Sequence, residues 1–135
     1  MNWKRYAMAV VAVLVMLLAT GFLVHGMLMA EDYKALGSIM RSPEEAAAHF
    51  PYMLLAQLLM ALAIVWIYAK GVEPKPWLGQ GVRFGLALWV LSGVATYLIY
   101  FAVEPLPSSL VTKQIVFGLL EGVPAGIVAA AVYRK

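Results

Sequence analysis

The chain contains four apolar runs, each close to the length that crosses a lipid bilayer. They cover about residues 6–29, 51–68, 78–100 and 111–132. A membrane-spanning helix needs roughly 17–25 mostly apolar residues, so every run is near or within that length. Hydrophobic residues make up 64% of the 135 residues and charged residues only 13%, which is too apolar for a soluble domain. The sequence therefore predicts an all-α polytopic membrane four-helix bundle, with residues 1–135 forming a single domain.

The basic residues predict how the four spans are oriented, because they collect on the cytoplasmic side of a membrane. With the N-terminus inside, the two sides divide seven to three: Lys4, Arg5, Lys70, Lys75, Arg83, Arg134 and Lys135 against Lys34, Arg41 and Lys113. Both termini are therefore predicted to be cytoplasmic. The sequence Ala19-Thr20-Gly21 also resembles a signal-peptide cleavage site, and cleavage there would remove the first span without changing the orientation of the rest.

The connection over residues 30–50 is the most polar stretch and is predicted to lie outside. Ser42 is a good helix N-cap, with Pro43 at the first helical position and Glu45 placed to complete a capping box. We expect a short outer-loop helix over residues 43–49. Because Pro51 disfavours a helical conformation at Phe50, a break or kink is expected before the second span.

Glu121 is the most unusual residue of the spans, because it lies near the middle of the last apolar run. Insertion of an acidic residue at the centre of a membrane helix costs roughly 3 kcal/mol, so such a residue usually faces the bundle interior. The other polar residues of the spans are predicted to lie between the bilayer midplane and its outer face. Arg83, which lies near the inner end, is a further supporting candidate. The intramembrane polar set is Glu121, Gln57, His25, Thr96, Gln114 and Arg83.

Two interpretations of this polar set remain open. In the first, a cavity opens to the outside and Glu121 at its floor accepts a proton or a small cation. In the second, Glu121 is a protonated acid that is hydrogen-bonded to Gln57 or Thr96 and holds helices together, which is the commonest role of such groups. Desolvation raises the pKa of a carboxyl group in either case, so a neutral side chain alone does not decide between them.

Two rows of glycines predict close helix packing. Gly118, Gly122 and Gly126 are spaced at four residues on the last span, and Gly81 and Gly85 are spaced likewise on the third. Small residues at this spacing let two helix backbones approach each other closely in a membrane. We expect these rows to pack helices, including those of a second copy of the chain.

Several functional classes find no support in the residues. The chain has no cysteine, no phosphate-binding glycine loop and no basic stripe of the kind that binds nucleic acid. His25 is followed by Met27 and Met29, a pattern of copper ligands, but Met27 points about 200° away from His25 on a helix. We expect no cofactor, no metal, no nucleic acid and no enzymatic activity.

Four motifs are spread along the chain: Gly21 to His25-Gly26, the run from Trp66 to Gly71, Arg83-Phe84-Gly85, and the glycine-spaced last span that ends in Tyr133. With these motifs the chain resembles small bacterial four-helix membrane proteins of unknown function. The resemblance covers most of the chain. It implies a multi-pass location in a bacterial cytoplasmic (inner) membrane and assigns no activity.

The leading hypothesis is a small inner-membrane protein without catalytic activity, an accessory or structural component that self-associates. The alternative is a proton- or cation-coupled carrier of small solutes that works as a homodimer, with Glu121 as its coupling site. The partners expected are therefore the lipid bilayer, a second copy of the chain and, for the carrier, a proton and a small solute.

Overall fold

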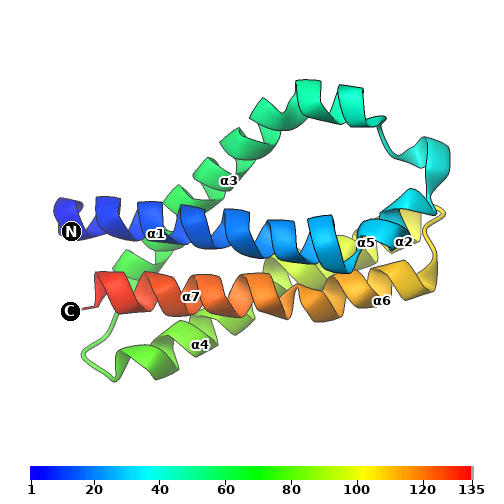
Figure 1. Cartoon of the computed structure of the whole chain (residues 1–135). Coiled ribbons are helices and arrows are strands. Elements are labelled where there is room, and N and C mark those ends of the chain that lie inside the picture. The colour runs from blue at the N-terminus through cyan, green and yellow to red at the C-terminus, as the bar shows by residue number, and fades with distance from the viewer. Residues whose placement is uncertain (135) are drawn as a thin grey trace.

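The protein is an all-helical bundle, seen in a computed structural model that describes residues 1–134 (Figure 1). Four helical stretches are long and apolar enough to cross a membrane: Trp3–Leu28, Gly37–Gly71, Trp77–Val103 and Ser108–Tyr133. The two described ends of the chain lie at the same end of the bundle, where the Asn2 backbone N–H donates to the Tyr133 hydroxyl (3.1 Å). We name this end the inner end, after the predicted orientation, and the opposite end, which holds residues 30–42, the outer end. The chain is therefore a multi-pass membrane protein, as the apolar runs predict.

Most of the four stretches are built from more than one helical segment. The first is α1 (Trp3–Gly21), which continues as a π-helix, η1 (Phe22–Leu28). The outer connection holds α2 (Ala30–Lys34) and a short 3-10 turn, η2 (Gly37–Ile39). The remaining elements are α3 (Pro43–Gly71), α4 (Trp77–Leu88), a second π-helix η3 (Trp89–Val94), α5 (Ala95–Val103), α6 (Ser108–Phe117) and α7 (Leu119–Tyr133).

The structure corrects the prediction for the outer connection. The capping box is present, since Ser42 Oγ accepts from the Glu45 N–H (3.2 Å) and the Glu45 carboxylate accepts from the Ser42 N–H (3.3 Å). The helix that starts there does not stop, however, because α3 runs without a break through Pro51 to Gly71. Proline removes one backbone hydrogen bond, but a full break would leave more backbone groups without partners where little water is available. The short outer-loop helix is instead α2.

The larger of two hydrophobic cores lies in the half of the bundle next to the chain ends. The buried residues of α1, α3 and α7 that pack there are Ala9, Val10, Val13, Leu17, Ala61, Val65, Tyr68, Ala125, Ala129, Ala130 and Tyr133. The outer half of α3 leans away from the other helices (Figure 1), and every residue of that helix from Pro43 to Leu59 is exposed except Gln57. At the opposite end a smaller core of Val24, Met29 and Leu110 is buried, and α3 alone separates from the other helices.

Helices α4 and α7 make the closest contact in the bundle, through the two predicted glycine rows. A Cβ atom built on Gly126 would lie 2.4 Å from the Gly81 oxygen and 2.4 Å from the Gly85 nitrogen. One built on Gly122 would lie 3.1 Å from the Gly85 oxygen. Both rows are therefore occupied within one chain, and a second copy has to dock on another surface.

Candidate functional site

Glu121 is positioned by a break in the last span. Helix α6 ends at Phe117 and α7 begins at Leu119, with Gly118 between them. The Trp89 indole donates to the carbonyl oxygen of Ile115 (2.7 Å), just before this break. Glu121 consequently lies in the first turn of α7, where the helix dipole favours a negative charge.

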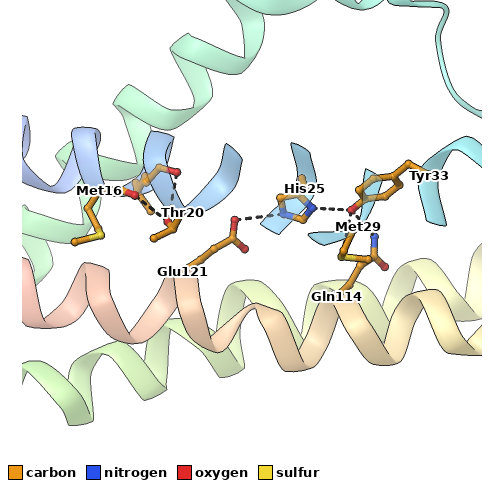
Figure 2. Close-up of polar contacts among 8 residues, drawn as sticks. Met16, Thr20, His25, Met29, Tyr33, Gln114 and Glu121 are labelled. Atoms are coloured by element: carbon orange, nitrogen blue, oxygen red, sulfur yellow. Dashed lines mark hydrogen bonds and ion pairs between the residues drawn. The ribbon is translucent and has the colours of Figure 1, made fainter. Parts of the chain in front are cut away.

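His25 pairs with Glu121 across the bundle. Its Nε2 lies 3.3 Å from Oε1 of Glu121, and the two side chains are 33% and 25% exposed (Figure 2). His25 belongs to the π-helix η1, a type of distortion that is frequent at functional sites. An ionisable pair thus joins the first span to the last in the middle of the bundle.

The pair continues into a row of polar groups that leads toward the outer connection. The other ring nitrogen of His25, Nδ1, lies 2.6 Å from the hydroxyl of Tyr33 in α2, and Gln114 Nε2 donates to the same hydroxyl (3.3 Å). The Tyr33 hydroxyl also lies 4.0 Å from the sulfur of Met29 (Figure 2). We call Glu121, His25, Tyr33 and Gln114 the polar row.

The polar row can hold His25 in either protonation state. When the ring is neutral, the Tyr33 hydroxyl can donate to Nδ1, which leaves the ring proton on the nitrogen that faces Glu121. When the ring is charged, Nδ1–H can donate to the Tyr33 oxygen, and the hydroxyl hydrogen can turn toward Met29. A proton can therefore be taken up without leaving either nitrogen of the ring unpartnered.

Gln57 of α3 and the Glu121 carboxylate both approach Gly21 of the first span. A Cβ atom on Gly21 would lie 3.7 Å from Glu121 Oε1 and 4.0 Å from Gln57 Nε2. The Oε1 atoms of Gln57 and Gln114 are buried and accept no hydrogen bond within residues 1–134. The site therefore keeps two acceptors that a proton-bearing group could fill.

The outer edge of the site is closed by an ion pair. Lys113 Nζ lies 2.8 and 3.0 Å from the two carboxylate oxygens of Asp32, which ties α2 to α6.

Burial raises the pKa of the Tyr33 phenol above its usual value of 10.0. The hydrogen bond from Gln114 lowers this pKa, and the charges of Glu121 and Asp32 raise it further. Tyr33 is therefore a neutral hydrogen-bonding group at physiological pH.

The structure brings together four of the six predicted polar residues, namely Glu121, Gln57, His25 and Gln114. Thr96 in α5 is half-buried and takes no part in the polar row. Arg83 lies elsewhere, because Gly81 and Gly85 face α7 and a residue two positions from each points away from it. Its guanidinium is directed toward Gly79 at the inner end of α4, 3.8 Å from the position of a Cβ there.

Tyr33 and the Asp32–Lys113 pair were not predicted from the sequence. Tyr33 follows His25 by eight residues, which corresponds to about two helical turns and the same helix face. That spacing could have indicated that Tyr33 lies near His25. The polar composition of residues 30–50, however, predicts a solvated connection and not a continuation of the first span.

No three His, Cys, Asp or Glu side chains gather as metal ligands among the described residues. In comparisons with protein-family models, curated proteins and solved structures, the chain matches none. What the site can do must therefore be argued from its own geometry.

Proposed function

We propose that this protein is a proton-coupled carrier of a small solute in a bacterial inner membrane, with Glu121 and His25 as its proton-binding pair. The observation that supports the proposal is the 3.3 Å contact between these two side chains inside an apolar bundle. An acid placed near the middle of a span is a candidate functional group by default, and here its partner is a second ionisable group. The polar row, continuing to Asp32 and Lys113, gives protons a route from the outer side.

Protonation of Glu121 would change which helices the site holds together. A charged carboxylate attracts a charged His25 on the first span. A protonated carboxyl group is a donor, and the buried Oε1 of Gln57 on α3 is an acceptor without a partner within residues 1–134. A proton would therefore shift the interactions of Glu121 from the first span toward the second, whose outer half is already separated from the bundle.

An infrared titration of the carboxylic-acid band tests the proposal in lipid. We expect a band that appears and disappears with pH in the wild type and is lost in Glu121→Gln. It should remain in Glu104→Gln, a matched control that removes an exposed acid at the outer turn. A change in its titration midpoint in His25→Gln would support the pair, because that variant removes the ionisable neighbour.

A Glu121 band that stays constant at every pH would contradict the proposal. In that case the carboxyl group never exchanges its proton and serves to hold helices together.

A second candidate is a non-catalytic accessory or structural component that self-associates. Within the most apolar stretch of the second span, only 11% of the residues are buried by the rest of the chain, and in the third span only 6% are. Wide apolar faces of both spans therefore remain free. Because the chain has no cysteine, single Leu55→Cys and Val15→Cys variants report on contacts between copies. A homodimer through the outer half of α3 should form disulfide crosslinks at position 55 and not at position 15, whereas a monomer would form neither.

A further inference from the structure

The inner end of the bundle contains two neighbouring cavities that the proton-binding pair does not use. They lie where residues 72–76 connect α3 to α4, at the same end of the bundle as both termini (Figure 1). Their volumes are about 350 and 310 Å³, and Tyr68, Glu73 and Gln80 line both of them. We call these two cavities together the inner site.

The connection that forms the inner site is held in one conformation by Gln80, which is 9% exposed. Its side-chain oxygen accepts from the Glu73 N–H (2.9 Å), and its Nε2 donates to the carbonyl oxygens of Glu73 (3.0 Å) and Lys75 (2.8 Å). All three bonds join a buried side chain to the backbone of the loop. The walls of the inner site are therefore ordered before any ligand arrives.

The inner site carries an excess of positive charge. Lys75 and Arg134 line the first cavity and Arg83 lines the second, against one carboxylate, that of Glu73. Lys75 is paired with Glu73 (2.5 Å), and this contact lowers the pKa of the glutamate. Arg83 and Arg134 have no carboxylate within salt-bridge distance among residues 1–134, and the Arg134 guanidinium lies over the Trp77 ring at 5.9 Å. Two cations are thus left to receive an anion.

A buried hydroxyl group at the same place lacks a partner. Tyr68 lines both cavities and is 4% exposed, and its hydroxyl makes no hydrogen bond within the described chain. A buried polar group without a partner is destabilising, so such a group points to a ligand or an ordered water. Phe84 and Ile67 give the second cavity an apolar wall beside these polar groups.

From this combination we propose that the inner site binds the headgroup of an anionic phospholipid. A phosphate diester accepts hydrogen bonds from guanidinium groups and from a phenol, and the lipid chains would follow the apolar wall into the bilayer. Basic pockets between membrane helices on the cytoplasmic side are known to hold such headgroups. Lys70 stacks over Trp66 at 5.7 Å, a pair typical of the membrane interface, which places the inner site at headgroup depth.

Lipid preference can be measured on the full-length protein in nanodiscs. Brominated lipids quench tryptophan fluorescence on contact, and Trp77 lines the first cavity. We expect brominated phosphatidylglycerol to bind at least about tenfold more tightly than brominated phosphatidylcholine, because both carry the phosphate diester but the choline ammonium of the second is repelled by Arg83 and Arg134. Arg83→Gln combined with Arg134→Gln should remove most of this preference.

Two further variants distinguish lipid binding at the inner site from general attraction of anionic lipids to basic residues at the membrane surface. Tyr68→Phe removes only the unpartnered hydroxyl and should weaken phosphatidylglycerol binding several-fold while leaving the ring in place. Lys70→Gln removes one cation at the same depth, outside both cavities, and should leave the preference unchanged.

The proposal is overturned if the wild type shows no preference, or if Lys70→Gln lowers it as much as the arginine variants do. It is also overturned if free glycerol phosphate competes with the lipid at equal concentration, because the site would then recognise a soluble phosphate ester. Circular dichroism of each variant checks that the bundle has folded. None of these readouts depends on Glu121, so the inner site can fail while the proton-binding proposal stands.

Discussion

The contact between α4 and α7 leads to a sharp prediction for Gly126→Ala. The new methyl carbon would lie 2.4 Å from Gly81 O and from Gly85 N, and 2.6 Å from Gly85 Cα. Ordinary Cβ contacts lie at 3.4–4 Å, so the two backbones must separate by about 1 Å at this point. The opposing atoms belong to the backbone of α4, and no flexible side chain can move aside to make room.

The cost follows from the size of that separation. Overpacking of a well-packed core costs typically 1–3 kcal/mol, and the upper end applies here because a gap of about 1 Å also weakens the neighbouring contacts. Replacing a helical glycine by alanine returns about 0.4–1 kcal/mol by restricting the unfolded chain. We expect a net loss of about 2 kcal/mol, which is roughly a 30-fold change in the unfolding equilibrium.

Unfolding by increasing fractions of dodecyl sulfate in mixed micelles, followed by circular dichroism, measures this loss. Gly71→Ala is the matched control, because a Cβ on Gly71 at the end of α3 meets nothing within 4 Å. It should be neutral or slightly stabilising. If Gly126→Ala unfolds at the same detergent fraction as Gly71→Ala, the two helices do not approach as closely as the glycine rows require, and the reasoning fails.

Two smaller effects follow from single side chains. Trp89→Phe removes the donor to Ile115 O (2.7 Å) and should lower stability in the same detergent assay by about 0.6–1 kcal/mol, with the helix content unchanged. For Tyr33, a pKa raised chiefly by burial means that the folded chain holds the phenol proton more tightly than the unfolded chain. Its contribution to stability is therefore complete below pH 10 and falls as the pH rises through the folded pKa. An ultraviolet titration should show that Tyr33→Phe lacks one tyrosine that ionises above pH 10; loss of one that ionises below it would contradict this placement.

The sequence predicted the number of spans and the location of the polar residues better than it predicted their partners. The length of an apolar run is a local property of the sequence, and it determines where a span can form. All four predicted spans are present, and the helical stretches that contain them are longer than the apolar runs. The capping box at Ser42 is equally local and is confirmed. Pro51 does not break α3, because the cost of breaking a helix in an apolar environment outweighs the conformational preference of a single residue.

The partners of Glu121 depend on which helix faces come together, and periodicity along one helix does not fix that. Depth along the spans groups Gln57, His25 and Thr96 with Glu121, and the structure places His25 against Glu121 and Gln57 near it but Thr96 outside the polar row. Arg83 was included for its charge, but the glycines on either side of it turn their face to α7 and direct the guanidinium elsewhere. Tyr33 was missed because α2 belongs to a connection that reads as a solvated loop.

The larger core and the polar row lie in different halves of the bundle, and this arrangement bears on the proposed mechanism. The inner half holds the larger core around Val13, Val65 and Ala129, and a smaller core around Val24, Met29 and Leu110 lies in the outer half. The outer half holds both π-helices, the polar row and the separated part of α3. Segments with few buried contacts open at low free-energy cost, whereas packed cores resist deformation. A change in the charge of Glu121 therefore acts at the boundary between the larger core and the separated part of α3, so we expect the conformational response in that part of α3 while the larger core stays in place.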